Sequence, residues 1–99
     1  MDDRPEYVIL SPCTTSKTIE MRTRDKIDLQ KSEKALSKAG QQVLANTSVF
    51  LSFVYSQKKF MLYGSGKIVI KEVDSKEGRP LLLEVFKLLK DSGCMVHEG

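Results

Sequence analysis

The side-chain types that carry out covalent chemistry are few and scattered in this sequence. Its two cysteines, Cys13 and Cys94, lie near opposite ends of the chain, and its only histidine is His97. A catalytic thiol is usually activated by a neighbouring histidine, and zinc sites use closely spaced Cys and His pairs. The sequence has neither pattern, so we expect two free thiols, no metal site and no cofactor.

A second candidate for chemistry is the segment Gly64-Ser65-Gly66-Lys67. It contains part of a phosphate-binding loop, but the complete loop requires the spacing GxxxxGK[ST], which is absent. A tight turn between two strands accounts for the same residues, because glycine supplies the backbone angles that such turns need. With titratable groups otherwise scattered, the sequence predicts that the protein is not an enzyme and has no small-molecule substrate.

Length and composition narrow the class of protein. A chain of 99 residues suits one domain, and 40% hydrophobic with 29% charged residues is ordinary for a globular fold. No apolar run is long enough to span a membrane, and the N-terminus lacks the pattern of a signal peptide, so we expect a cytoplasmic protein. The net charge of +3 is a mild bias toward anionic partners.

Hydrophobic periodicity places the elements that hold these residues. Residues 14–23 alternate as a half-buried strand does. Asp28 is a good N-cap for a helix through Ala39, and Gly40 suits the position after the helix end. Strand-like runs joined by short turns then occupy 42–73, and a second helix begins near Ser75 and ends at Gly93.

The expected fold is α+β. It has one curved antiparallel sheet of about five strands with two helices on one face, in the order β-α-β-β-β-β-α, because consecutive strands with short turns pair antiparallel. We expect residues 1–13 to form an N-terminal arm or an extra edge strand, 14–94 a single domain, and 95–99 a flexible C-terminal tail.

The period of two along a strand assigns each side chain to one face of the sheet. One face is almost purely apolar and should lie under both helices; it consists of Ile19, Met21, Val49, Leu51, Phe53, Tyr55, Phe60, Leu62, Ile68 and Ile70. The other face mixes basic, hydroxyl, aliphatic and aromatic residues: Thr18, Glu20, Arg22, Phe50, Ser52, Val54, Ser56, Lys59, Met61, Tyr63, Lys67, Val69 and Lys71.

This mixed face is the candidate functional surface, because an exposed apolar patch rimmed by basic residues is typical of a binding site. One interpretation is contact with nucleic acid, in which lysines neutralise phosphates and apolar side chains lie in the minor groove. The candidate DNA-binding residues are Thr18, Arg22, Phe50, Ser52, Val54, Lys59, Met61, Tyr63, Lys67, Val69 and Lys71. The other interpretation is that a second copy, or the N-terminal arm, covers this face.

Part of the sequence resembles the TATA-binding protein family. The segment Tyr-Gly-Ser-Gly-Lys-Ile-Val-Ile at 63–70, followed by Glu-Val-Asp-Ser-Lys and a helix, is similar to that family's aromatic residue, Ser-Gly-Lys turn, strand and helix start. Ile-Asp-Leu at 27–29 is similar to its Leu-Asp-Leu. The order of elements agrees over roughly 14–94, so the resemblance implies a fold like one half of that family's structure.

The resemblance also implies roles for single residues. Tyr63 and Phe50 match, or nearly match, the two phenylalanines that wedge between base pairs. Lys67 matches a lysine that approaches phosphate, and Val69 and Met61 match apolar residues lying against the minor groove. Thr18 would face the DNA from the first strand.

Four positions depart from the family's pattern. Ser16 stands roughly where the family has a central asparagine, Lys71 replaces a small hydroxyl residue, Glu20 adds a negative charge, and Ser56 replaces a phosphate-binding arginine. The family also fuses two repeats, whereas this chain has one. A single repeat leaves an open sheet edge, so we expect a homodimer with two-fold symmetry.

Two functional hypotheses follow. The first is a small nucleic-acid-binding module, a DNA-binding transcription-related or architectural protein that acts as a homodimer on double-stranded DNA. The alternative is a protein–protein interaction or dimerisation module without DNA binding. Burial of Phe50 and Tyr63 in a partner would favour the second hypothesis.

Overall fold

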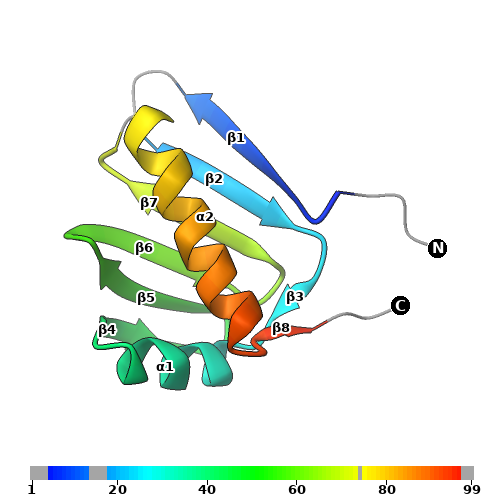
Figure 1. Cartoon of the computed structure of the whole chain (residues 1–99), viewed down its shortest axis with the longest axis vertical. Coiled ribbons are helices and arrows are strands. Elements are labelled where there is room, and N and C mark those ends of the chain that lie inside the picture. The colour runs from blue at the N-terminus through cyan, green and yellow to red at the C-terminus, as the bar shows by residue number, and fades with distance from the viewer. Residues whose placement is uncertain (1–4, 14–17, 74, 97–99) are drawn as a thin grey trace.

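An antiparallel sheet with both helices on one side forms the body of the molecule (Figure 1). The computed structural model describes residues 5–13, 18–73 and 75–96. These residues form a six-stranded sheet in the order β1-β2-β7-β6-β5-β4 and a two-stranded sheet of β3 and β8. The strands are β1 (Tyr7–Cys13), β2 (Thr18–Thr23), β3 (Lys26–Ile27), β4 (Gln42–Asn46), β5 (Phe50–Tyr55), β6 (Lys58–Tyr63), β7 (Lys67–Lys71) and β8 (Met95–Val96). The helices are α1 (Leu29–Lys38) and α2 (Ser75–Asp91). The predicted α+β fold class is confirmed.

The first helix begins and ends where its capping residues predict. The Asp28 carboxylate accepts a hydrogen bond from the backbone N–H of Lys31 at 3.0 Å, which satisfies one of the unpaired donors of the first turn. At the other end Gly40 adopts a φ of +84°, the left-handed conformation that follows many helices. Leu36 and Ser32 are the buried residues of α1, and they fix which side of the helix meets the sheet.

The hydrophobic core lies between the helices and one face of the sheet. The sheet contributes side chains of one parity: Ile19, Met21, Leu51, Phe53, Phe60, Leu62, Ile68 and Ile70. Leu36 of α1 and Leu82, Val85 and Leu89 of α2 pack onto them. The rings of Phe53 and Phe60 stack with centroids 5.2 Å apart. Burial of these side chains supplies most of the stability of a domain this small, and it leaves the opposite face of the sheet without a helix.

The N-terminal segment forms a sixth strand at the edge of the sheet. β1 pairs antiparallel with β2 from Tyr7↔Thr23 to Leu10↔Glu20. Two contacts hold its start against α2: the Tyr7 ring lies 5.3 Å from the ring of Phe86, and Lys90 Nζ lies 3.0 Å from Glu6 Oε1. The segment was expected to be either an arm or an extra edge strand, and residues 7–13 form the edge strand.

Two expectations from the sequence are wrong. Val49 was expected under the helices, but it is 63% exposed. It lies in the β4–β5 turn, where Thr47 Oγ1 accepts hydrogen bonds from the backbone N–H groups of Val49 and Phe50. Met95 and Val96 were expected in a flexible tail, but they form β8 and pair with β3. The expected strand residues 14–17 and the last three of the tail lie outside the described residues.

Candidate functional site

The strand register brings all eleven candidate residues to one face of the sheet. Directly opposed residues of an antiparallel pair project to the same side, so each chain of partners forms a row across the sheet. One row is Phe50, Tyr63, Lys67 and Arg22, and the middle row is Ser52, Met61, Val69 and Glu20. The pairs Val54–Lys59 and Lys71–Thr18 have the same parity and lie on the same side. We call this surface the helix-free face.

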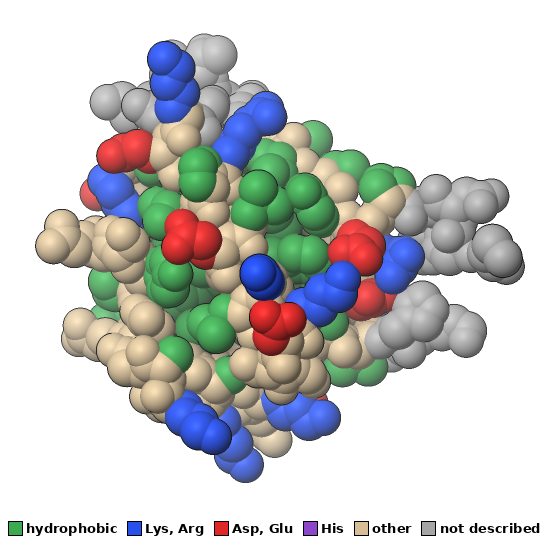
Figure 2. Space-filling model, in the orientation of Figure 1, with side chains coloured by type: hydrophobic (Ala, Val, Ile, Leu, Met, Phe, Trp, Pro, Cys, Tyr) green, Lys and Arg blue, Asp and Glu red, His purple; other side chains and the backbone are tan. Residues whose placement is uncertain are grey.

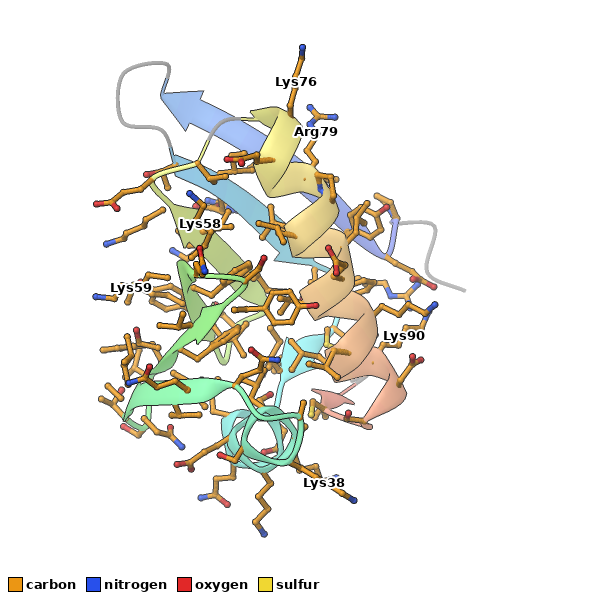
Figure 3. The ribbon with its side chains drawn as sticks, turned by 60° about the vertical axis from the view of Figure 1, so that its left-hand side comes forward. Lys38, Lys58, Lys59, Lys76, Arg79 and Lys90 are labelled. Atoms are coloured by element: carbon orange, nitrogen blue, oxygen red, sulfur yellow. The ribbon has the colours of Figure 1, made fainter. Side chains whose placement is uncertain are left out.

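The helices cover the opposite side of the sheet. Phe60 and Ile70, which are opposed in the β6–β7 register, are fully buried in the core under the helices. Their neighbours Lys59 and Lys71 must therefore project the other way and are exposed. In Figure 3 Lys59 projects from the side of the sheet that lies away from α2.

Beside Glu20, the middle row is an apolar strip formed by Met61 and Val69 together with Ser52. Val69 is 8% exposed and Ser52 is 4% exposed, although no helix lies over them. The neighbouring side chains of the same face must therefore cover them. Ser52 Oγ has no hydrogen-bond partner within the described part of the chain. A buried hydroxyl without a partner is uncommon in proteins, and this one lies beneath the side chains that cover the centre of the face.

The two aromatic residues of the first row lie close together. The rings of Phe50 and Tyr63 have centroids 6.1 Å apart and are tilted by 42°. The Tyr63 hydroxyl lies 3.9 Å from Met61 Sδ, two residues away on the same strand, so the ring extends along β6. Lys67 Nζ lies 4.3 Å from the centroid of this ring, a distance at which a cation is attracted to the ring face.

The basic residues of this face differ in how freely their charge is available. Arg22 Nε lies 2.6 Å from Glu20 Oε2, so that guanidinium is paired. Lys59 and Lys71 are exposed and have no hydrogen bond or ion pair with any described residue. The charges of Lys59 and Lys71 are therefore available to an anionic ligand.

Positive charge outweighs negative charge on this face. Among the residues that the structure describes, it has four basic side chains and one carboxylate, Glu20, a net charge of +3. The helix-bearing side shows acidic and basic side chains interspersed (Figure 2).

Comparison with family models, with curated proteins and with solved structures gave no match.

Two further features of the described residues bear on function. Neither helix is long and apolar enough to cross a membrane. Within residues 5–13, 18–73 and 75–96, no group of three or more His, Cys, Asp or Glu side chains could hold a metal ion.

The residues predicted from the sequence omit part of the helix-free face. Val8 opposes Arg22 and Leu10 opposes Glu20, so both point to this side, and they are 43% and 39% exposed. Ala45 opposes Ser52 and extends the middle row at the other edge. The alternation of Val8 and Leu10 within the N-terminal segment is the signal that could have placed them, once that segment was known to be a strand.

The titratable groups with shifted pKa values lie on the other side of the sheet. Burial raises the pKa of the Cys94 thiol, and a hydrogen bond with Ser32 partly opposes this shift. The pKa of Tyr55 is raised by partial burial and then by the Glu84 carboxylate, which accepts its hydroxyl at 3.1 Å. Neither residue belongs to the helix-free face, so neither contributes to the candidate site.

Proposed function

We propose that the protein is a small nucleic-acid-binding module whose helix-free face contacts double-stranded DNA. The observation that carries the proposal is the excess of positive charge on this face, where the described residues include four basic side chains and one carboxylate, a net charge of +3. Phosphate neutralisation by lysine supplies most of the affinity of non-specific DNA binding. In Lys59 and Lys71 the face offers two exposed ammonium groups without competing partners.

The apolar strip between the charged rows would lie against the minor groove. Minor-groove binding relies on apolar contact, because that groove presents few hydrogen-bonding groups to distinguish bases. Met61, which is partly exposed between the buried residues Ser52 and Val69, would provide this contact. The resemblance to the TATA-binding protein family supports a transcription-related or architectural role.

The test is DNA affinity as a function of salt concentration. Fluorescence anisotropy with a labelled duplex should give a linear decrease of log K with log salt for the wild type. In the variant Lys59→Gln/Lys71→Gln the slope should fall by about two, at roughly 0.9 for each phosphate that is no longer neutralised. Lys76→Gln/Lys87→Gln is the matched control, because it removes the same charge from exposed residues of α2.

Two results would reject DNA binding by this face. One is the absence of any salt-dependent binding of the wild type at low ionic strength. The other is an equal loss of affinity in both double variants, which would mean that only the overall charge matters. Thermal unfolding of both variants should remain close to that of the wild type, because all four lysines are exposed.

A second candidate function, formation of a homodimer, is favoured by the edge strand β1. Val8 and Leu10 are large apolar residues that are 43% and 39% exposed on the helix-free face, and the strand Tyr7–Cys13 has no charged residue to protect its open edge. We propose that two copies associate through this edge. The alternative function, a dimerisation module without DNA binding, would rest on the same contact.

Analytical ultracentrifugation tests the homodimer. The wild type should sediment as a dimer at micromolar concentration, and Val8→Lys/Leu10→Lys should sediment as a monomer. Lysine on an edge strand opposes strand pairing between molecules. A monomeric wild type would reject the homodimer, and a dimer that persists in the variant would reject this edge as its interface.

A further inference from the structure

A basic hollow lies on the helix-bearing side, apart from the helix-free face. Its volume is about 330 Å³, and it is lined by Lys31, Lys34, Ala35 and Lys38 of α1 and by Ser92, just beyond the end of α2. Figure 3 shows Lys38 projecting from α1 away from the sheet. This hollow is not part of the surface that we propose for DNA, because α1 packs on the opposite side of the sheet.

The three lysines occupy one side of α1 because of their spacing. Residues three and four apart are neighbours on a helix surface, so Lys34 is adjacent to both Lys31 and Lys38, with Ala35 between them as a small apolar floor. Like charges at this spacing destabilise a helix slightly. The arrangement therefore has a small cost in the free protein, and a bound anion would remove it.

No carboxylate lines this hollow. The ammonium groups of Lys31, Lys34 and Lys38 are without a hydrogen bond or ion pair to the residues that the structure describes. The nearby Asp28 carboxylate accepts the backbone N–H of Lys31 as the helix cap. Lys90 on α2 differs from them, because its ammonium group is paired with Glu6.

We propose that this hollow binds the phosphate group of a small ligand. Three ammonium groups can donate to the several oxygens of a phosphate, and a hydrogen bond between two charged groups is about twice as strong as a neutral one. Ser92, an exposed residue just beyond α2, adds a hydroxyl to the lining of the hollow. A phosphate group offsets more of the charge of three lysines than a single carboxylate does, and a diphosphate fits within about 330 Å³.

The test is titration with inorganic pyrophosphate at fixed ionic strength, followed by the backbone amide signals of the ¹⁵N-labelled protein. The signals of residues 31–38 and Ser92 should shift and saturate together. Lys31→Gln/Lys34→Gln/Lys38→Gln should bind at least about tenfold more weakly, and Ser92→Ala a few-fold more weakly. Glutamine keeps the helix propensity of lysine, so the variant should remain folded.

The matched control is Lys58→Gln/Lys76→Gln/Arg79→Gln, which removes three basic side chains that belong to neither proposed site. Its affinity for pyrophosphate should stay within about twofold of the wild type, because exposed charges more than about 10 Å apart are screened by salt. The proposal is overturned if the wild type shows no saturable shift, or if both triple variants lose affinity equally. It is also overturned if these amides respond to duplex DNA but not to pyrophosphate, since the ligand would then be a nucleic-acid backbone.

Discussion

The packing of α2 on the sheet can be tested at Gly78, a buried helical glycine. A Cβ atom at this position would lie 2.4 Å from Ile19 Cδ1 and 3.0 Å from Val73 Cγ1. Ile19 is 2% exposed and packed within the core, so its methyl group has little room to move. Replacing Gly78 by alanine would gain about 1 kcal/mol of helix propensity but incur about 1–3 kcal/mol of overpacking. We expect Gly78→Ala to lower the free energy of unfolding by up to about 2 kcal/mol.

A double-mutant cycle with Ile19→Val isolates this contact. In the wild type Ile19→Val should cost about 1 kcal/mol, because it removes a buried methyl group. In the Gly78→Ala background the same change removes the clashing methyl, so its cost should vanish or change sign. The coupling energy should therefore be about 1 kcal/mol or more, measured by urea unfolding.

Ile27→Val is the matched control, since Ile27 is also a buried isoleucine, 4% exposed, and is not among the nearest neighbours of a methyl group added at Gly78. It should be additive with Gly78→Ala within about 0.5 kcal/mol. Additivity of Ile19→Val as well would refute the placement of α2 against the Ile19 side of β2. The helix-free face would then be wrongly identified.

The other predictions concern a turn glycine, a strained hairpin and a buried thiol. Gly66→Ala should lower the free energy of unfolding, measured in urea, by more than about 2 kcal/mol, because φ is +105° and a Cβ would lie 2.6 Å from a backbone oxygen. Gly40→Ala should lower it by about 1 kcal/mol, because φ is +84° but the space around the added methyl is open. Ser56→Asn/Gln57→Gly should raise the free energy of unfolding by about 1 kcal/mol, since both residues have positive φ in a two-residue hairpin turn. Cys94 is fully buried with a raised pKa, so its alkylation, followed by peptide mass spectrometry, should be at least about a hundredfold slower in the native than in the unfolded protein.

Each of these has a clear contrary result. Equal costs at Gly66 and Gly40 would show that the crowding around Gly66 is absent. A hairpin variant of unchanged stability would show that Ser56 and Gln57 are not strained. Rapid alkylation of native Cys94 would mean that the thiol is accessible to solvent.

The raised pKa of Cys94 also fixes the sign of a pH effect. The folded state holds the thiol proton more tightly than the unfolded state, where the ordinary value is 9.0. The resulting contribution to stability is complete below that value and is lost as pH rises through the folded pKa. Stability should therefore fall above about pH 9 more steeply in the wild type than in Cys94→Ala.

Much of the fold could be predicted from local sequence signals. The first helix was placed correctly from Asp28 and Gly40, because a cap and a left-handed terminal residue act within a few positions of the chain. The short β3–β8 pair could not be predicted, since Ile27 and Met95 meet only through the tertiary fold. Val49 was misplaced because alternation was extended into a turn that the Thr47 hydroxyl holds.

The helix-free face was predictable as a set but not in its details. Strand parity alone gathers its members, because side chains alternate between faces. The Arg22–Glu20 ion pair could also have been predicted from the sequence, because residues two apart on a strand project to the same side. The contact of Lys67 with Tyr63 and the burial of Ser52 depend on the register between strands, which alternation does not determine.

Methionine methyl groups offer the most direct test of which surface binds DNA. Met61 lies in the middle row of the helix-free face, whereas Met21 is fully buried on the other side of the sheet and Met95 lies in β8. With methyl-¹³C-methionine protein and an unlabelled duplex, the Met61 signal should shift and saturate while those of Met21 and Met95 stay in place. A shift at Met95 with Met61 unchanged, or no shift at any of the three, would contradict DNA binding through this face.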